Sequence, residues 1–307
     1  MKYFLIFLFL GVPLVVFSDE TEQVDGFRQM ATSFYDAGDY ESATIFYTKA
    51  IEKNPENPDL YNGRGLIFMQ VGKYHEAMND FDKAFQLNPN MANTSANQGA
   101  IFLLLGQFER AIQKYTEALA LEPYNAEYYK TRGMIFEETG KNELAFADFD
   151  KAIEINPYSA SVYNVRGYLY MKLNEFEKAM SDFRSAVLHD PKDSASFTGM
   201  GTISYYLEEY SSAIEYFTKA LEIQSDYVGA FSSRGIAYYA LREYENAIKD
   251  FTCALEIDSQ SGELYWYRAL VYRRLMEQTP DYTLKVEYQN MAKADLAKAR
   301  EFGYTGK

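Results

Sequence analysis

Apolar and small residues recur along the chain with a period of 34 residues, and within each period they follow one another at intervals of three and four. This spacing places them on one face of a helix, because a helix completes a turn in about 3.6 residues. Small residues stand at three fixed places in nearly every period, and large apolar residues stand between them. The pattern predicts two antiparallel helices per period that approach closely where the side chains are small.

Prolines mark the end of most periods. A proline has no backbone N–H and cannot continue a helix, so it indicates the turn after the second helix. The prolines that take repeat position 32 are Pro55, Pro89, Pro123, Pro157 and Pro191, and the same step continues to Ser225 and Ser259. The predicted repeats are then residues 24–57, 58–91, 92–125, 126–159, 160–193, 194–227, 228–261 and 262–303.

Four positions of this frame carry the strongest pattern. Position 8 is glycine or alanine in all eight repeats, and positions 20 and 27 are alanine in the first seven. Position 24 is aromatic in the same seven: Tyr47, Phe81, Tyr115, Phe149, Phe183, Phe217 and Phe251. A glycine followed two residues later by an aromatic residue, as in Gly38-Asp39-Tyr40, predicts the turn between the two helices.

This arrangement resembles the tetratricopeptide repeat family, in register over residues 24–276 and through about residue 303 with one interruption. The resemblance implies an all-α fold, a right-handed superhelical solenoid of about eight helix pairs. It also implies that the first helices line a concave groove, in which members of the family mostly bind peptides or partner proteins.

The eighth repeat departs from the pattern. Its first helix fits, but Ala292, Leu296 and Ala299 reach positions 20, 24 and 27 only after 11 additional residues. The insert lies near residues 277–287 and predicts a loop followed by a longer helix from about Asp281. Terminal repeats commonly differ from the others because they cover an apolar face that would otherwise meet water, so capping is the simplest interpretation.

Two charged positions are present or absent together. Position 7 is arginine and position 23 is aspartate in the same five repeats: Arg64 with Asp80, Arg132 with Asp148, Arg166 with Asp182, Arg234 with Asp250, and Arg268 with Asp295 after the insert. The other three repeats lack both residues. Joint occurrence predicts an ion pair between the two helices of each such repeat, whereas common descent of the repeat copies would also carry the two residues together.

The resemblance also implies which residues line the groove, since the family presents positions 2, 5, 9, 12 and 13 of each first helix there. In this sequence those positions form an apolar and aromatic stripe that is richest from Tyr168 to Trp266. The predicted partner-binding residues are Tyr168, Met171, Tyr205, Tyr206, Tyr239, Trp266, Arg273 and Arg274, of which the two arginines are expected to receive an acidic part of the partner. The alternative is that the tyrosines pack on neighbouring first helices and only stabilise the array.

Residues 1–18 have the three-part pattern of a secretory signal peptide, with a positive start at Lys2, an apolar run, and the small residue Ser18 before a polar stretch. Cleavage after Ser18 would leave residues 19–23 as a short N-terminal segment before the first repeat. We therefore expect an exported protein, in the periplasm, secreted, or in the lumen of a secretory pathway, with no membrane span after cleavage. An uncleaved anchor is the alternative, although the run contains Pro13 and is shorter than the about 20 residues that span a bilayer.

Composition narrows the class of partner. The formal net charge is −14, whereas nucleic-acid binding needs a positive surface, so we expect no nucleic-acid partner. Aromatic residues make up 17% of the chain, so it is too apolar to be disordered. The chain has two histidines, His75 and His189, and a single cysteine, Cys253, which are too few for an internal disulfide or for a zinc site built from these ligands.

Motifs for catalysis or cofactor binding are absent from the sequence, which has neither a glycine-rich phosphate loop nor a Gly-x-Ser-x-Gly elbow. We therefore predict no catalytic, cofactor-binding or metal-binding residues, and a non-catalytic scaffold that binds a peptide or another protein. The alternative is an accessory subunit of an envelope or secretory-pathway enzyme or assembly complex. Two residues stay open: Cys253 as a free thiol or in an intermolecular disulfide, and Asn93 as a glycosylation site if the source is eukaryotic.

Overall fold

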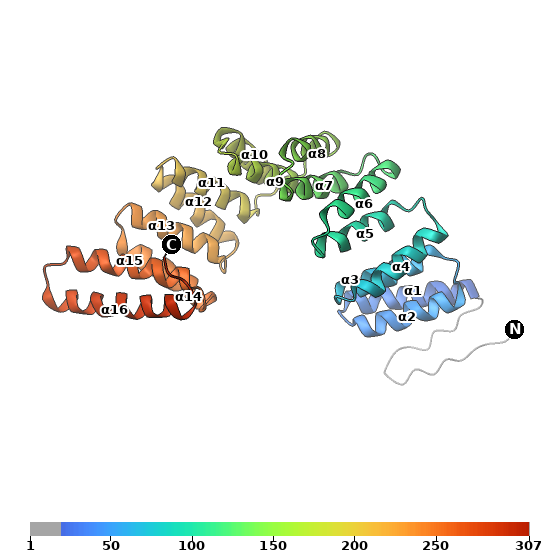
Figure 1. Cartoon of the computed structure of the whole chain (residues 1–307), viewed down its shortest axis with the longest axis horizontal. Helices are drawn as coiled ribbons and strands as arrows, with labels where there is room; N and C mark the ends of the chain where they lie inside the picture. The colour runs from blue at the N-terminus through green and yellow to red at the C-terminus, as the bar shows by residue number, and fades with distance from the viewer. Residues whose placement is uncertain (1–19, 307) are drawn as a thin grey trace. The chain divides into compact units, whose positions relative to one another are not determined.

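The computed structural model describes residues 20–306, and this part of the chain is entirely helical outside its turns. The predicted signal peptide, residues 1–18, lies outside the described residues. Between residues 20 and 306, sixteen helices form eight consecutive pairs, which confirms the predicted all-α class and the eight helix pairs (Figure 1). None of these helices is long and apolar enough to cross a membrane.

The helices divide into two compact units, and each is described by itself. Unit 1 extends to Ile155 and unit 2 begins at Asn156. Unit 1 contains α1 (Glu20–Asp36), α2 (Tyr40–Lys53), α3 (Pro58–Gln70), α4 (Tyr74–Leu87), α5 (Ala92–Leu104), α6 (Phe108–Leu121), α7 (Ala126–Glu138) and α8 (Asn142–Ile155). Unit 2 contains α9 (Ala160–Lys172), α10 (Phe176–His189), α11 (Ser194–Tyr206), α12 (Tyr210–Ile223), α13 (Val228–Ala240), α14 (Tyr244–Ile257), α15 (Gly262–Gln278) and α16 (Tyr282–Glu301).

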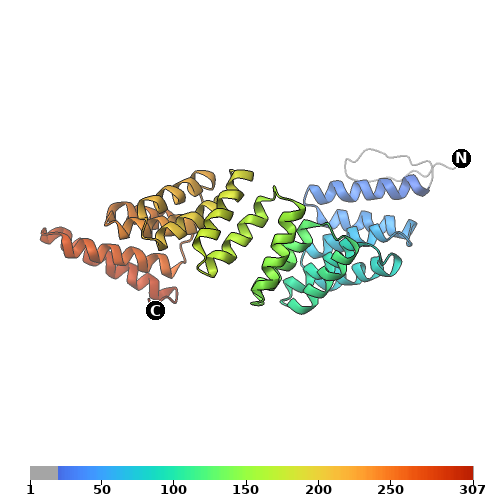
Figure 2. The same cartoon turned by 90° about the horizontal axis from the view of Figure 1, so that it is seen from above.

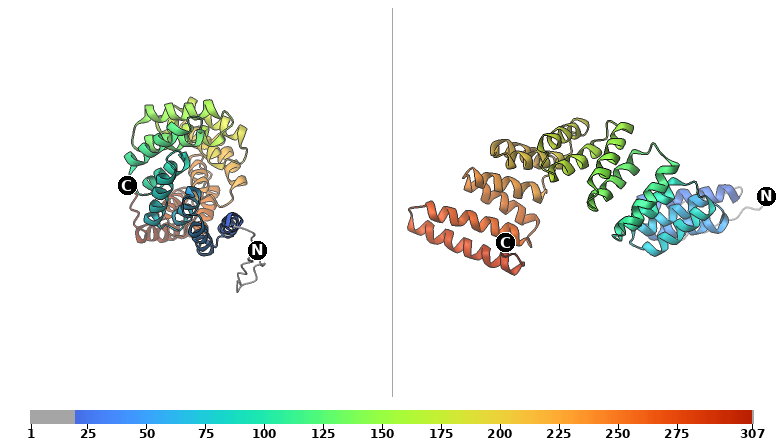
Figure 3. Two further views of the ribbon diagram at one scale, coloured as in Figure 1. Left: turned by 90° about the vertical axis from the view of Figure 1, so that its right-hand side faces the viewer. Right: turned by 45° about the horizontal axis from the view of Figure 1, so that its top comes forward.

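Helices contact their near neighbours along the chain. Within each unit, the two helices of a pair pack side by side, and the second helix packs against the first helix of the next pair (Figures 2 and 3). In unit 2 the first helices α9, α11, α13 and α15 also contact one another in this order. This is the arrangement expected of a repeat array, in which each repeat is stabilised by its neighbours.

The core of each repeat is an aromatic ring held between small residues. The phenylalanines at position 24, from Phe81 to Phe251, are 0–1% exposed, and the alanines at positions 20 and 27 are fully buried. A Cβ atom added to Gly65 would lie 2.6 Å from the Phe81 ring, and one added to Gly201 would lie 2.7 Å from the Phe217 ring. The prediction that small residues let the two helices approach is therefore confirmed, and the glycine makes room for the ring of its own repeat.

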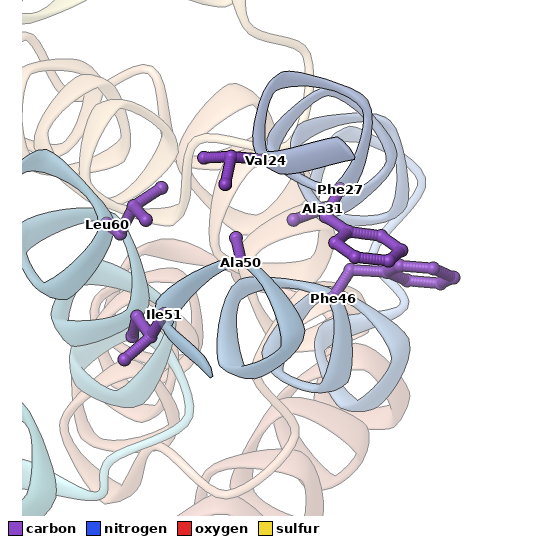
Figure 4. Close-up of a cluster of buried hydrophobic side chains, with 7 residues drawn as sticks. All are labelled: Val24, Phe27, Ala31, Phe46, Ala50, Ile51 and Leu60. Carbon is purple, nitrogen blue, oxygen red and sulfur yellow. The ribbon is translucent and has the colours of Figure 1, made fainter. Parts of the chain in front are cut away.

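The first repeat shows how this packing begins (Figure 4). Its buried cluster contains Val24, Phe27 and Ala31 from α1, Phe46, Ala50 and Ile51 from α2, and Leu60 from α3. Phe46 stands at position 23, where five other repeats have aspartate. Its ring stacks on Phe34 at 5.4 Å between centroids and lies 6.2 Å from Phe27. Apolar contacts thus replace the ion pair in this repeat.

The predicted ion pairs form in all five repeats that carry both residues. In each, the arginine donates two hydrogen bonds to the two carboxylate oxygens of its aspartate, at 2.7–2.9 Å. The aspartate side chains are only 6–8% exposed and the arginine side chains 17–19%. Two-pronged geometry and burial make these pairs stronger than ordinary surface pairs.

Further partners hold each arginine in place. In four of the five repeats its Nη1 atom donates a hydrogen bond to a threonine of the preceding repeat: Arg64 to Thr48, Arg132 to Thr116, Arg234 to Thr218, and Arg268 to Thr252. In four of the five repeats, aromatic rings at positions 4 and 11 flank the guanidinium group; for Arg64 these are Tyr61 and Phe68, at 5.9 and 5.8 Å from their centroids. The arginine therefore joins two helices of its own repeat to the second helix of the repeat before it.

The turns between paired helices differ between the two units. In unit 1 the turn residue is a glycine with a positive φ of 68–78° in all four pairs: Gly38, Gly72, Gly106 and Gly140. In unit 2 the equivalent residues are Asn174, Glu208 and Arg242, with φ of 60–62°. The predicted glycine turn is thus confirmed for unit 1, whereas unit 2 places side chains in a conformation that normally favours glycine.

The last pair is longer than the others because the inserted residues extend both of its helices. α15 has 17 residues and α16 has 20, against 13 and 14 in a pair such as α13 and α14. The loop is shorter than predicted, because Glu277 and Gln278 belong to α15. Asp281 precedes α16, and its side chain accepts hydrogen bonds from the backbone of Thr283 and Leu284, which confirms the predicted start of the long helix.

Candidate protein-binding groove

All eight predicted partner-binding residues lie on the first helices of unit 2. They are Tyr168 and Met171 on α9, Tyr205 and Tyr206 on α11, Tyr239 on α13, and Trp266, Arg273 and Arg274 on α15. Because these helices contact one another in chain order, they present one continuous surface, called here the first-helix surface of unit 2. The eight residues nevertheless fall into three groups: two are used in packing, five lie at or beside two hollows, and one is covered by another segment of the chain.

Tyr168 and Met171 belong to the packing between helices. The Tyr168 hydroxyl donates a hydrogen bond to the carbonyl of Ala195 on α11 at 2.7 Å, and its ring meets Phe183 edge to face at 5.0 Å between centroids. Burial raises the pKa of Tyr168. Met171 is half-buried against the same core cluster as Phe183. Both residues thus contribute to packing between helices, and the contact of Tyr168 with α11 is of the kind that the alternative interpretation describes for the tyrosines.

A hollow of about 260 Å³ opens across α11, α13 and α15. Its lining residues are Thr202, Tyr205, Tyr206, Phe217, Ser233, Ile236 and Tyr267. Tyr206 is 62% exposed, and its ring stacks on Phe176 at 5.9 Å. Tyr205 meets Tyr206 edge to face at 6.2 Å, and burial raises the pKa of Tyr205. The hollow is therefore a depression lined by aromatic rings and hydroxyl groups, to which α11, α13 and α15 contribute together with Phe217 of α12.

A second hollow, of about 380 Å³, lies at the ends of α13 and α15. Its lining residues are Tyr239, Ala240, Arg242, Tyr244, Arg274, Glu277 and Gln278. Arg274 donates hydrogen bonds from Nε to the Tyr239 hydroxyl at 3.1 Å and from Nη1 to Glu277 at 2.9 Å. These bonds, with the Tyr239 bond as the larger cause, raise the pKa of Arg274. The structure therefore brings together two residues, Tyr239 and Arg274, that the sequence analysis placed on the groove.

Positive charge gathers at this end of the surface. Arg273 and Arg274 are both exposed, as predicted, and Arg242 is exposed beside them in the second hollow. Sequence reasoning missed Arg242 because it occupies the turn and not a groove position of a helix. The sequence does show that glycine is absent at this turn. Arg242 has a positive φ of 62°, a conformation that normally favours glycine, so its side chain is placed there at a cost in backbone strain.

Trp266 is half-buried, and a segment of the chain itself lies against it, which the sequence analysis did not predict. The ring of Tyr304, beyond the end of α16, meets the indole edge to face at 5.7 Å. Gly306 lies against the indole nitrogen, so closely that a side chain on Gly306 would collide with it. Trp266 also touches its neighbour Tyr267 at 5.2 Å. Tyr267, which sequence reasoning missed, lines the first hollow, and burial raises its pKa.

Unit 1 has a smaller hollow on its first helices. Its volume is about 120 Å³, and its lining residues are Thr32, Tyr35, Tyr47, Gly63, Leu66 and Ile67. A larger hollow of unit 1, about 360 Å³, lies between α2 and the end of α3 and is lined by Tyr40, Glu41, Thr44, Ile45, Phe68, Val71 and Lys73. Tyr47 in the smaller hollow and Tyr40 to Ile45 in the larger one belong to α2, so a second helix contributes to both of these hollows of unit 1.

The two histidines and the cysteine lie on different helices of the described structure. Within residues 20–306, no three histidine, cysteine, aspartate or glutamate side chains are grouped so that they could hold a metal ion. His189 lies between the rings of Tyr158 and Tyr163, at 5.6 and 5.8 Å. Cys253 is a half-buried free thiol whose pKa is raised by burial, and that shift leaves less reactive thiolate at neutral pH.

Family models of repeat proteins match most of the chain. Models described as tetratricopeptide repeat match residues 58–91 and 228–261, residues 97–160, and residues 160–193 and 195–227. A model described as TPR repeat matches residues 32–72. None of the curated proteins has a matching sequence.

Solved structures share the fold at low sequence identity. A tetratricopeptide repeat protein from Parabacteroides merdae is 20% identical, with a TM-score of 0.62 over 89% of this chain and 99% of that one. PilF of Pseudomonas aeruginosa is 19% identical, with a TM-score of 0.60 over 69% of this chain and 96% of that one. A chain of the APC/C heterotetramer Cut9–Hcn1 is 17% identical, with a TM-score of 0.57 over 92% of this chain and 54% of that one. These similarities concern the fold alone.

Proposed function

Because this chain belongs to the tetratricopeptide repeat family, a family of protein-interaction scaffolds, we propose that it is a non-catalytic scaffold that binds a segment of a partner protein on the first-helix surface of unit 2. The observation that carries this proposal is the aromatic hollow shared by α11, α13 and α15. Tyrosine rings favour protein contacts because they offer a large apolar area at a low cost in side-chain entropy. Tyr206, at 62% exposure, already presents such a ring to water.

The size of the hollow supports a protein segment as the ligand. Small-molecule sites commonly enclose about 300–1,000 Å³ and surround most of the ligand. The two hollows, of about 260 and 380 Å³, are near the lower end of this range and are open to solvent, so neither would surround a small molecule, and each can hold one or two side chains of a protein segment. The second hollow uses residues of α13 and α15 as well, so an extended or helical segment can place side chains in both.

Charge supports an acidic partner segment. Arg242 and Arg274 line the second hollow, and Arg273 is exposed next to Arg274. Arginine recognises carboxylates through two parallel hydrogen bonds. Glu277 already pairs with Arg274 in this hollow, so Arg242 and Arg273 are the arginines that we expect to meet acidic side chains of the partner.

The proposed compartment is outside the cytoplasm, on the strength of the signal-like residues 1–18 alone. Export with cleavage would give a mature chain that begins at Asp19. Intact-mass measurement of the protein from its native source tests this proposal. A chain that still begins at Met1 would contradict it and would favour the uncleaved anchor.

The groove is tested with variants that alter the first hollow from two directions. Tyr206→Ala removes an exposed ring, and Ser233→Arg fills the hollow from α13. Tyr124→Ala is the matched control, because it removes a tyrosine that is 79% exposed in unit 1. Each tagged variant is first shown to be folded by circular dichroism and is then used to recover partners from the exported fraction, with quantification by mass spectrometry.

We expect proteins that wild type recovers to be lost with both Tyr206→Ala and Ser233→Arg and retained with Tyr124→Ala. Loss of one exposed aromatic anchor typically costs about 2 kcal/mol or more of binding free energy, which weakens affinity about thirtyfold. Equal recovery with all three variants would place the binding surface elsewhere and end the proposal for this groove.

A further inference from the structure

The chain beyond α16 folds back onto the first-helix surface of unit 2. Figure 1 draws this end of the chain across α15. Tyr304 packs edge to face on Trp266 at 5.7 Å, and Gly306 lies against the indole nitrogen of the same tryptophan. Just before this segment, Phe302 stacks on Tyr265 at 6.0 Å. A position that the family pattern assigns to the groove is therefore occupied by residues of the chain itself.

The end of α16 directs the segment to this place. Gly303 takes a positive φ of 79°, and its N–H bonds to the carbonyl of Arg300 at 3.0 Å. The N–H of Tyr304 bonds to the carbonyl of Ala299 at 2.8 Å. These two bonds end the helix with a reversal of direction, for which glycine is the favoured residue. The reversal turns Tyr304 toward the beginning of α15.

The site at Trp266 that Tyr304 and Gly306 occupy is called here the seat. Small residues on both sides of the contact leave room for it. A Cβ atom on Gly262 would lie 2.7 Å from the Cβ of Tyr304, so glycine at the start of α15 leaves room for the tyrosine. Gly306 approaches the indole of Trp266 where any side chain would collide. Trp266 in turn touches Tyr267, which lines the first hollow. The segment therefore lies at the border of the proposed binding groove.

We propose that Tyr304–Gly306 is a built-in ligand that occupies the Trp266 end of the groove and is displaced when a partner segment binds there. Its chemistry defines the class of segment that competes for the seat: an aromatic residue followed, after one residue, by glycine. The inference rests on the proposed function for its role in binding, but the seat itself is tested without any partner protein.

Tethering gives the resident segment an advantage over a free one. A segment joined to its site by a short link acts at an effective concentration in the millimolar range. If the resident segment occupies the seat about nine-tenths of the time, a free peptide that makes the same contacts binds wild type about tenfold more weakly than a protein whose seat is empty. A segment that only completes the core would show no such exchange.

Trp266 reports directly on the seat because it is the only tryptophan in the chain. Tyr304→Ala removes the ring that covers the indole, and Gly306→Val introduces a side chain where there is no room. Tyr282→Ala is the control, since Tyr282 is 80% exposed near the start of α16. We expect both seat variants, and not the control, to shift tryptophan emission to longer wavelength and to increase quenching by acrylamide.

The peptide Arg-Glu-Phe-Gly-Tyr-Thr-Gly, residues 300–306, is then titrated into each protein while tryptophan emission is recorded. It should return the emission of Tyr304→Ala toward that of wild type, and a peptide with alanine in place of tyrosine should not. Emission that is the same in wild type and both seat variants would overturn the inference. So would a failure of the peptide to restore emission, or equal peptide affinity for wild type and Tyr304→Ala. None of these outcomes alters the partner-recovery test of Tyr206→Ala, so the two proposals fail separately.

Discussion

Unit 1 and unit 2 repeat the same helix pair but end their first helices differently. Unit 1 uses glycine at every turn, in the conformation that glycine adopts without strain. Unit 2 uses Asn174, Glu208 and Arg242 at the equivalent places. A β-carbon in this left-handed conformation costs about 1 kcal/mol, and asparagine tolerates it better than glutamate or arginine. The chain therefore accepts strain in unit 2 that it avoids in unit 1.

The strained turns of unit 2 directly follow the aromatic ends of its first helices. Glu208 comes two residues after Tyr206, and Arg242 comes three residues after Tyr239. Arg242 lines the second hollow, where its side chain adds positive charge. Strain at a turn is commonly retained where the side chain has a role in binding. The difference between the units is what we expect if unit 2, as proposed, carries the binding surface for a partner.

The largest expected effect concerns a feature that both units share. Asp80→Ala in unit 1 and Asp182→Ala in unit 2 each leave a half-buried arginine without its carboxylate. We expect each to lower the free energy of unfolding by about 3–5 kcal/mol, against about 0–1 kcal/mol for an exposed aspartate such as Asp226. Thermal melts measure the loss, and hydrogen exchange assigns it to a unit. Melts equal to that of Asp226→Ala would show that the ion pairs do not hold the repeats together.

A smaller effect on the free energy of unfolding distinguishes unit 1 from unit 2 at high pH. In the third repeat, in unit 1, Tyr115 stands where unit 2 has Phe183, Phe217 and Phe251, and burial raises the pKa of Tyr115 from 10.0 to about 12. The folded state holds this proton more tightly than the unfolded chain. Stability from this group is therefore fully present below about pH 10 and is lost as the pH rises through about 12, by about 3 kcal/mol in total.

Tyr115→Phe should remove this loss. Urea denaturation of wild type and Tyr115→Phe at a series of alkaline pH values measures the difference between them, so the titration of other tyrosines cancels. We expect the two proteins to diverge progressively above pH 10, with the variant the more stable. Parallel curves across this range would mean that Tyr115 ionises as easily in the folded protein as in the unfolded chain.

The turns themselves give the smallest effect on stability and the sharpest contrast between the units. Gly72→Ala should destabilise unit 1 by about 1 kcal/mol through backbone strain alone, since no atom lies within 4 Å of the added Cβ. Glu208→Gly and Arg242→Gly should stabilise unit 2 by up to about 1 kcal/mol, and Asn174→Gly by less. Chemical denaturation measures the free energy of unfolding of all four variants. If glycine destabilises unit 2 at Glu208 and Arg242, the proposed strain is absent.

Arg242→Gly also links strain to binding. We expect the variant to be more stable than wild type and yet to recover less partner protein, because it loses a positive side chain of the second hollow. Arg300→Ala, at an exposed arginine near the end of α16, is the control. Unchanged recovery with Arg242→Gly would remove this arginine from the binding surface.

The repeat frame could be predicted because small residues and prolines recur at fixed intervals, and each has one simple physical meaning. The ion pairs could be predicted because Arg64 and Asp80, and their counterparts, occur together in the same repeats. The bond from Arg64 to Thr48 could not, because threonine on a helix surface has many roles and this one depends on contact with the preceding repeat.

The groove was predicted less well, for reasons that lie in packing. Tyr168 and Tyr206 look alike in the sequence, but a carbonyl of α11 accepts a hydrogen bond from one, while the other stays 62% exposed. Trp266 fits the family pattern of a groove residue, and only the reversal at Gly303 shows that Tyr304 covers it. Arg242 lies outside that pattern because it belongs to a turn.

Site-specific photo-crosslinking in the native host tests most directly whether unit 2 is the binding part of the chain. A photoreactive amino acid is placed at position 206, in the first hollow of unit 2, and at position 35, in the hollow on the first helices of unit 1. The account predicts a discrete crosslinked adduct from position 206 that disappears when Ser233→Arg is added, and none from position 35. An adduct from position 35 together with none from position 206 would contradict it and would assign the partner to unit 1.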